Sequence, residues 1–274
     1  MPIVGMIRKN GDFLKTGDAL KEAIEKGHVD NYELAILTTM LDPMPHSDKP
    51  TASAIAGGAW RRTVLEHILD YYVFPDDQVA MLRGTIMHSG FERLRYPPGV
   101  KLEREKRLLA NLPGTLKDRV ISGQLDVIYT DFGRLVDHKT TKSIPSIIRK
   151  EHIYQLAIYV WLARWSGLTV NDVGINYVGW NDIEYINVTE FEGEVVRAID
   201  HPLIKDEQVF VQWVSYGYNV LSTGYKKSKR GKHLIPSMQD CNTTWCANCP
   251  VKWACDRIPI EGGEIDPAEF KQDE

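Results

Sequence analysis

The spacing of apolar residues along this chain changes from a helical period to a strand period and back. Four helical patterns occur in the first hundred residues, and we expect helices at 18–26, 31–41, 51–72 and 77–94. Strand-like alternation follows, and we expect strands at 101–109, 119–130, 133–141, 173–180 and 183–191. A long amphipathic helix at 145–165 lies between the third and fourth of these strands, and a final helix is expected at 193–222. The order helix, three strands, helix, two strands predicts an α/β fold, in which helices flank a central mixed β-sheet.

Two of the predicted strands form a hairpin that brings acidic residues together. The stretch Thr130–Gly133 between them is typical of a turn, since its glycine can adopt a positive φ. Folding at the centre of this turn places Asp126 opposite Asp137, and facing residues on antiparallel strands have Cβ atoms roughly 4.5–5.5 Å apart. Side chains alternate between the faces of a strand, so Lys139 shares the face of Asp137 while His138 points the other way.

The surroundings of these acids decide between two interpretations. An aspartate and a lysine two positions apart on a strand usually form a solvated ion pair worth about 0–1 kcal/mol. Here both acids are flanked by apolar residues, which predicts that both strands are buried. Two buried carboxylates about 5 Å apart repel each other unless a cation, a shared proton or a basic neighbour neutralises them. We favour a divalent metal ion, because two carboxylates and a lysine are what metal-assisted cleavage of a phosphodiester needs.

Two pairs of polar residues lie on predicted helices at a spacing that places each pair on one helix face. They are His88 with Glu92, and Gln155 with Tyr159. Each pair alone is more typical of an ordinary surface or of the border of a packed face. Three carboxylates could add a metal ligand, and the sequence does not select among them: Glu92, Glu103 and Glu105.

The bulk composition narrows the class of protein. The 274 residues carry a net charge of −4 and are 43% hydrophobic, as in ordinary globular proteins. No run of about 18 apolar residues occurs, so we expect no membrane span, and the absence of an apolar leader favours a cytoplasmic protein. There is no Gly-x4-Gly-Lys-Ser/Thr loop, so we expect no nucleotide cofactor. The basic cluster between Lys226 and Lys232 is either a solvated loop or a nucleic-acid contact.

All four cysteines lie within fifteen residues, in the pattern Cys241-x4-Cys246-x2-Cys249-x5-Cys255. In a cytosolic protein such clustering favours a metal site over disulfides or inert thiols. Four thiolates can hold tetrahedral zinc or an iron–sulfur cluster. The single Cys-x2-Cys pair, followed by Pro250, favours iron–sulfur, with zinc as the alternative.

In combination, these residues resemble the PD-(D/E)XK nuclease superfamily, and in particular its RecB-like exonuclease branch, which includes CRISPR-associated exonucleases. The resemblance covers about residues 50–255. It rests on five motifs that occur in the family's order: Gly84-Thr85-x2-His88-x3-Glu92, Gly123-x2-Asp126, Asp137-x-Lys139-Thr140, Gln155-x3-Tyr159 and Cys246-x2-Cys249-x5-Cys255. One departure is Ala59, which stands where iron–sulfur members carry an upstream cysteine; Cys241 is the only substitute.

The resemblance implies a restriction-endonuclease-like core and a set of roles. We expect His88, Asp126, Asp137 and the backbone carbonyl of His138 to bind Mg²⁺ or Mn²⁺, and Lys139 to orient the attacking water. The resemblance further implies that Gln155 and Tyr159 position the substrate strand. It implies a structural 4Fe–4S cluster, or Zn²⁺, on the four cysteines: Cys241, Cys246, Cys249 and Cys255.

The expected function is a metal-dependent DNA exonuclease acting on single strands or DNA ends, in recombination, repair or phage DNA processing. A structure-specific endonuclease and a non-catalytic DNA-binding subunit of a recombination complex are the alternatives. A helicase or recombination protein could deliver the substrate. We expect an N-terminal helical region at 1–76, a nuclease core at 77–222, a basic loop with the cysteine segment at 223–258 and a disordered acidic tail at 259–274.

Overall fold

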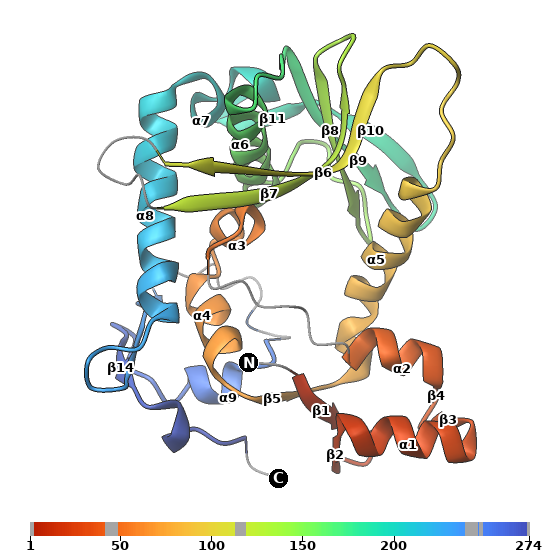
Figure 1. Cartoon of the computed structure of the whole chain (residues 1–274), viewed down its shortest axis with the longest axis vertical. Helices are drawn as coiled ribbons and strands as arrows, with labels where there is room; N and C mark the ends of the chain where they lie inside the picture. Colours follow the sequence, from red (N-terminus) through yellow and green to blue (C-terminus); the bar gives the residue numbers. More distant parts are fainter. Residues whose placement is uncertain (1–2, 42–48, 113–118, 239–245, 247–248, 273–274) are drawn as a thin grey trace. The chain divides into compact units, whose positions relative to one another are not determined.

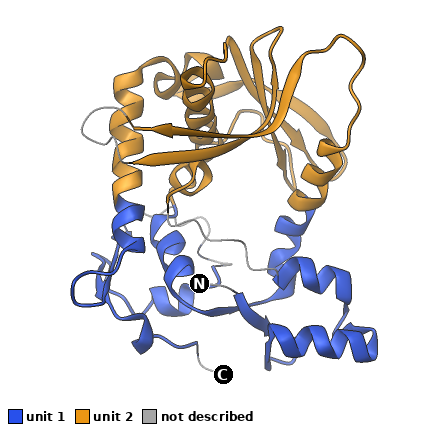
Figure 2. Ribbon diagram, viewed as in Figure 1, with its two compact units in different colours: residues 1–48, 59–83, 220–274 blue, residues 49–58, 84–219 orange. Residues whose placement is uncertain are grey.

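The computed structural model describes residues 3–41, 49–112, 119–238, 246 and 249–272. The chain forms two compact units, each assembled from separate stretches of sequence (Figure 2). The sheet unit comprises residues 49–58 and 84–219, and the terminal unit comprises residues 1–48, 59–83 and 220–274. Helices α5 (Val79–Glu92) and α8 (Glu207–Tyr225) contribute residues to both units, and the linear ranges expected from the sequence stay a prediction.

The sheet unit is built on a five-stranded sheet with the strand order β10-β9-β8-β7-β6 (Figure 1). Strands β6, β7 and β8 form an antiparallel meander, β8 and β9 are parallel, and β10 returns antiparallel to β9. The predicted mixed sheet is therefore confirmed. The strands are β6 (Leu102–Asn111), β7 (Val120–Tyr129), β8 (Arg134–Thr140), β9 (Asp172–Val178) and β10 (Ile183–Ile186).

Helix α6 (Lys150–Trp165) is the crossover between the two parallel strands β8 and β9. Every residue from 156 to 163 is buried, because the helix packs against β6, β7 and β9 as well as α3 (Ala52–Ala56) and α7 (Pro202–Lys205). A parallel strand pair needs a long connection of this kind, and burying it between layers forms the core of the unit.

The hairpin between β7 and β8 has the register that the sequence predicts. Val127 pairs with Val136, and continuing this register by one residue places Asp126 opposite Asp137. Gly133 closes the turn with φ +61°. The register is set locally, because the glycine permits the turn and the pleat then fixes which side chains face each other.

Two predicted helices are wrong in part. The segment 51–72 divides into α3, α4 (Trp60–Ile68) and the strand β5 (Tyr71–Val73), since Gly58 adopts φ +64° between the helices. The segment 193–222 begins with strand β12 (Glu194–Arg197), which pairs with β11 (Val188–Phe191) around Gly193 at φ +84°. A 3₁₀ turn, α7 and α8 follow, and Pro202 opens α7 as a proline in a first helical turn commonly does.

The terminal unit contains strands where the sequence predicts only helices. Its three-stranded sheet has the order β2-β1-β5, in which β1 (Ile3–Ile7) is parallel to β5 and antiparallel to β2 (Phe13–Lys15). Strand β14 (Gly263–Ile265) pairs with β13 (His233–Ile235), so residues 263–265 of the expected disordered tail are part of a sheet. This unit also contains α1 (Thr16–Lys26), β3 (His28–Val29), β4 (Tyr32–Glu33), α2 (Leu34–Leu41) and α9 (Lys252–Cys255).

The side chain of Arg61 joins the C-terminal segment to helix α4 within the terminal unit. It is fully buried, and its guanidinium donates hydrogen bonds to four backbone carbonyls, those of residues 236, 255, 258 and 259. Arginine suits this position because it presents five donors in a fixed plane and has no acceptor to satisfy. In the described part of the chain, no helix is both long and apolar enough to cross a bilayer.

Candidate active site

The acidic pair of the hairpin is buried and lies beside a lysine. Asp126 Oδ2 accepts a hydrogen bond from the backbone N–H of His138 at 2.6 Å, and Asp137 is only 1% exposed. Lys139 Nζ lies 2.8 Å from Asp137 Oδ2. Within the described residues, neither oxygen of Asp137 has a partner with hydrogen-bond geometry. Buried polar atoms without such partners are rare, so this carboxylate is prepared to accept a further ligand.

The two carboxylates perturb each other. Burial raises the pKa of Asp126 to about 8, and the neighbouring charge of Asp137 contributes to this rise. The N–H of His138 and the ammonium of Lys139 act on this pKa in the opposite direction but do not cancel the effect. At neutral pH the metal-free site would therefore retain a proton that a bound cation would displace.

Two residues from neighbouring elements complete a group around Asp126. His88 Nδ1, from α5, lies 3.6 Å from Asp126 Oδ1 and 3.6 Å from Glu105 Oε1. One ligand atom from each of these three residues lies within 4.8 Å of the other two. The structure thus brings together His88 and Asp126, as the sequence predicts, and adds one of the three carboxylates that the sequence left open.

The backbone of β6 explains why Glu105 is the carboxylate that joins the group. Arg104 and Lys106 pair with Val127 and Leu125, but Glu105 between them has φ +47° and takes no part in the ladder. Such a conformation is uncommon for a residue with a side chain and often marks a functional site. Gln124 Nε2 donates to Glu105 Oε2 at 2.7 Å and orients it.

The other two candidate carboxylates lie elsewhere. Glu92 is exposed at the end of α5, and Glu103 forms an ion pair with Lys106. Neither belongs to the group of possible metal ligands among the described residues. Of the three carboxylates, only Glu105 is therefore brought next to Asp126 by the pairing of β6 with β7.

The donor set fits a hard divalent cation. Among the described residues, the group of possible metal ligands holds two carboxylates and one imidazole, from Glu105, Asp126 and His88, and the predicted ligand Asp137 is not part of it. Oxygen ligands suit Mg²⁺ and Mn²⁺, and the imidazole shifts the preference toward Mn²⁺. The ring of His138 stacks on Phe91 with centroids 4.1 Å apart. The contribution of the His138 carbonyl to metal binding stays a prediction.

Helix α6 packs closely against strand β7 at Gly123, which has no side chain. A Cβ atom on Gly123 would lie 2.7 Å from Leu162 Cδ1 and 3.0 Å from Tyr159 Cε1, so a larger residue at this position of β7 would force these side chains of α6 to shift. Gln155 Nε2 donates to the Tyr159 hydroxyl at 2.5 Å, as their helical spacing predicts. Burial, followed by the charges of Asp137 and Asp126, holds the pKa of Tyr159 well above its usual value, so its hydroxyl stays protonated.

Comparison with known proteins agrees with this arrangement. A sequence model of the PD-(D/E)XK nuclease superfamily matches residues 18–256. The chain belongs to the PD-(D/E)XK nuclease superfamily.

Two solved structures are also similar to this PD-(D/E)XK chain. "Crystal structure of SSO0001" shares 18% identity with a TM-score of 0.49, covering 88% of this chain and 96% of that one. A "Putative exonuclease" from Eubacterium rectale shares 10% identity with a TM-score of 0.30, covering 66% of this chain and 71% of that one. A search of curated proteins finds no match.

Two residues beside Lys139 were missed by the sequence analysis. Tyr177 on β9 is the in-register neighbour of Lys139, and its hydroxyl lies 2.7 Å from His152 Nδ1 on α6. Burial lowers the pKa of His152 to about 4, and Lys139 acts in the same direction, so the imidazole is neutral. His152 lies one helical turn before Gln155, and that spacing could have indicated it. Tyr177 is found only through the sheet register.

The predicted cysteine site is not assembled among the described residues of this nuclease. The sulfur atoms of Cys246, Cys249 and Cys255 do not gather within 4.8 Å of one another, and Cys241 lies outside the described residues. Cys255 Sγ instead accepts a hydrogen bond from Arg61 Nε at 3.1 Å. Burial raises the pKa of Cys249 to about 11, which favours the thiol over the metal-binding thiolate.

Proposed function

We propose that this protein is a Mg²⁺- or Mn²⁺-dependent deoxyribonuclease that works as an exonuclease on single-stranded DNA or on DNA ends. The observation that carries the proposal is the buried pair Asp126 and Asp137, with Lys139 against one carboxylate and His88 against the other. Membership of the nuclease superfamily supports the hydrolysis of phosphodiester bonds. The exonuclease assignment rests on the sequence motifs.

Each residue of the site has its own role in the proposed reaction. Asp126, Asp137, His88 and Glu105 would hold the cation, which supplies Lewis-acid polarisation of the scissile phosphate and a more acidic bound water. Lys139 is positioned to orient the water and to offset negative charge that develops on the phosphate oxygens. Gln155 and the neutral hydroxyl of Tyr159 would orient the strand by hydrogen bonds.

A comparison of linear and circular single strands tests the proposal. Purified protein with Mn²⁺ or Mg²⁺ should degrade the linear strand and leave the closed circle intact. Substitution Lys139→Ala should lower the rate by about 10²–10³-fold, the usual loss when one electrostatic stabiliser is removed. Lys142→Ala, an exposed lysine three residues further along, is the matched control and should retain full activity.

Each result separates the candidate functions. Cutting of the circle would show a structure-specific endonuclease. Metal-dependent DNA binding without any cleavage would show the non-catalytic subunit. A Lys139→Ala variant that cuts as fast as wild type would refute the role of the lysine.

We retain the metal cluster on Cys241, Cys246, Cys249 and Cys255 as a proposal. It is supported by the short spacing of these cysteines in the sequence. The iron, sulfide and zinc content of purified protein, together with its colour, distinguishes a 4Fe–4S cluster, a Zn²⁺ site and a protein with no metal on these cysteines.

We further propose a cytoplasmic role in recombination, repair or phage DNA processing, with a helicase or recombination protein supplying the ends.

A further inference from the structure

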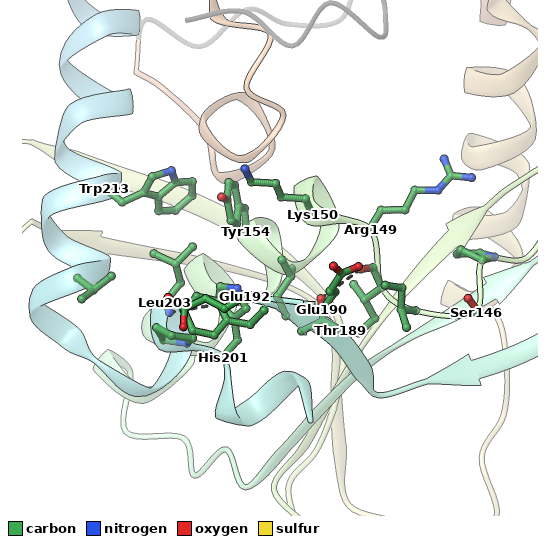
Figure 3. A pocket seen from close by; sticks show the side chains of 17 residues that line it. Ser146, Arg149, Lys150, Tyr154, Thr189, Glu190, Glu192, His201, Leu203 and Trp213 are labelled. Carbon is green, nitrogen blue, oxygen red and sulfur yellow. Dashed lines mark hydrogen bonds between the residues drawn. The ribbon is translucent and has the colours of Figure 1, made fainter. Parts of the chain in front are cut away.

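A cavity lies in the sheet unit, beside helix α6 (Figure 3). It has a volume of about 930 Å³, within the range of cavities that hold small molecules or single nucleotides. Its walls come from the segment before α6 and the first turn of that helix, from the β11–β12 hairpin, and from α7 and α8. The proposed catalytic chemistry uses none of these lining residues.

Aromatic pairs form two parts of the wall. Tyr154 and Trp213 contact each other with ring centroids 4.9 Å apart, and Phe191 and His201 contact each other at 5.3 Å. Figure 3 shows Tyr154 and Trp213 on the side of α6 and α8, with His201 on the opposite side. His201 Nδ1 accepts from the backbone N–H of Leu203, and burial lowers the pKa of its ring, so His201 is neutral. Such walls favour a flat, uncharged ring over a charged group.

The charged residues of the cavity are arranged in two groups. Arg149 and Lys150 are exposed at the start of α6, and Lys150 Nζ lies over the Tyr154 ring at 5.6 Å from its centroid. Glu190 and Glu192 are exposed on the β11–β12 hairpin. A phosphate would be attracted to the two basic residues and repelled by the two carboxylates, which can accept N–H groups of a nucleobase. This charge pattern fits a nucleotide with its phosphate at Arg149 and Lys150.

The cavity adjoins the catalytic strand through the start of α6. The backbone N–H of Arg149 donates to the Tyr177 hydroxyl, the group that also contacts His152. The Arg149 side chain donates to Thr141 Oγ1 at 3.3 Å, one residue after β8 ends. Lys150 and Tyr154 line the cavity one helical turn apart, while His152 lies near Lys139. A DNA strand bound at the hairpin could therefore reach the cavity across a single turn of helix.

We propose that this cavity binds one unpaired base of the substrate strand, stacked on Tyr154 and Trp213, with its phosphate held by Arg149 and Lys150. The proposal rests on the proposed nuclease function and names the form of DNA that the enzyme takes. A base enters the cavity only after it leaves its complement, so single-stranded ends are preferred over paired ends. Stacking on aromatic rings tolerates every base, because each base has a π-face.

Fluorescent single strands test this site directly. A set of 12-nucleotide strands carries 2-aminopurine at one position each, and binding is measured in Mn²⁺ with the Lys139→Ala variant of the full chain. We expect quenching at one position near the cut end. This quenching should be lost when Tyr154→Ala or Trp213→Ala is introduced into the Lys139→Ala protein. Binding should weaken about 5- to 150-fold in each, the range that single base–aromatic stacks correspond to. Trp165→Ala, an exposed tryptophan on the same helix outside the cavity, is the matched control.

A second measurement needs no change to the protein. An abasic nucleotide at the quenched position should raise KM for the wild-type enzyme about tenfold, and at other positions it should have no effect. Equal quenching at all positions, quenching that survives both substitutions, or normal cleavage of every abasic strand would overturn the base pocket while leaving the nuclease assignment intact. Quenching that depends on Tyr154 and Trp213, in a wild-type protein that cleaves no DNA, would overturn the nuclease assignment instead.

Discussion

Replacing Asp126 with asparagine should stabilise the metal-free protein at alkaline pH while abolishing cleavage. The Asp126 carboxyl has a pKa of about 8 in the folded state, against an ordinary value of 3.8. Its charged form is therefore disfavoured by folding. As the pH rises from about 4 to about 8, the unfolded chain releases this proton before the folded chain does, so the free energy of unfolding falls. In the Asp126→Asn variant the side chain has no proton to release, and this contribution would vanish.

The size of the effect follows from the pKa difference. A pKa unit corresponds to about 1.36 kcal/mol, so four units set a ceiling of roughly 5 kcal/mol at pH 8. The introduced amide carbonyl can still accept from the N–H of His138, but its NH₂ group needs new partners at a cost of about 1–3 kcal/mol. The net gain is about 2–4 kcal/mol at pH 8, and near pH 4 only the cost remains.

Urea unfolding in EDTA at pH 4, 6 and 8 measures this prediction, with the free energy of wild type subtracted from that of the variant. Asp182→Asn, which alters an exposed aspartate of the same unit, is the matched control and should give a flat profile. In Mn²⁺ at about 1,000 times Kd the order should reverse, because such binding stabilises wild type by about 4.1 kcal/mol, more than the variant's gain. A variant destabilised equally at all three pH values would refute the reasoning.

Three further substitutions test other parts of the structure. Glu105→Gln should weaken Mn²⁺ binding at least about tenfold in titration calorimetry, as loss of one carboxylate ligand implies, whereas Glu92→Gln should leave it unchanged. Gly123→Ala should lower the free energy of unfolding by about 1–3 kcal/mol through overpacking against α6, and an unchanged urea midpoint would contradict this. Its control, Gly90→Ala, with open space around its Cβ in a helix, should be neutral or stabilising by up to about 1 kcal/mol. Arg61→Met should cost more than about 3 kcal/mol by leaving buried carbonyls unpaired, and amide exchange in residues 255–265 should accelerate.

Some errors in the predicted elements could have been avoided from the sequence. Gly57-Gly58 and Pro202 are breakers inside two segments that were predicted as single helices, and the structure interrupts both segments near these residues. The strand β1 pairs locally with β2 through a turn that contains Gly11 at φ +92°, and a turn glycine is a signal that the sequence carries. Its parallel pairing with β5, more than sixty residues further along the chain, is a non-local contact that no local pattern indicates.

The sequence by itself determined the hairpin that carries Asp126, Asp137 and Lys139. Strand alternation and a turn glycine are local properties, and together they fix both the register and the face of each side chain. The order of the motifs likewise identified the superfamily, and the order of the predicted helices and strands indicated the mixed sheet around that hairpin.

Only the tertiary structure decided which other groups reach this hairpin. It brings Glu105 to the acidic pair and Tyr177 beside Lys139, and it leaves the described cysteines apart. The first two outcomes depend on which strands lie side by side, and the place of Glu105 also goes with a positive φ that no local pattern indicates. Periodicity determines the face on which a side chain lies, whereas the packing of distant segments determines what that face meets.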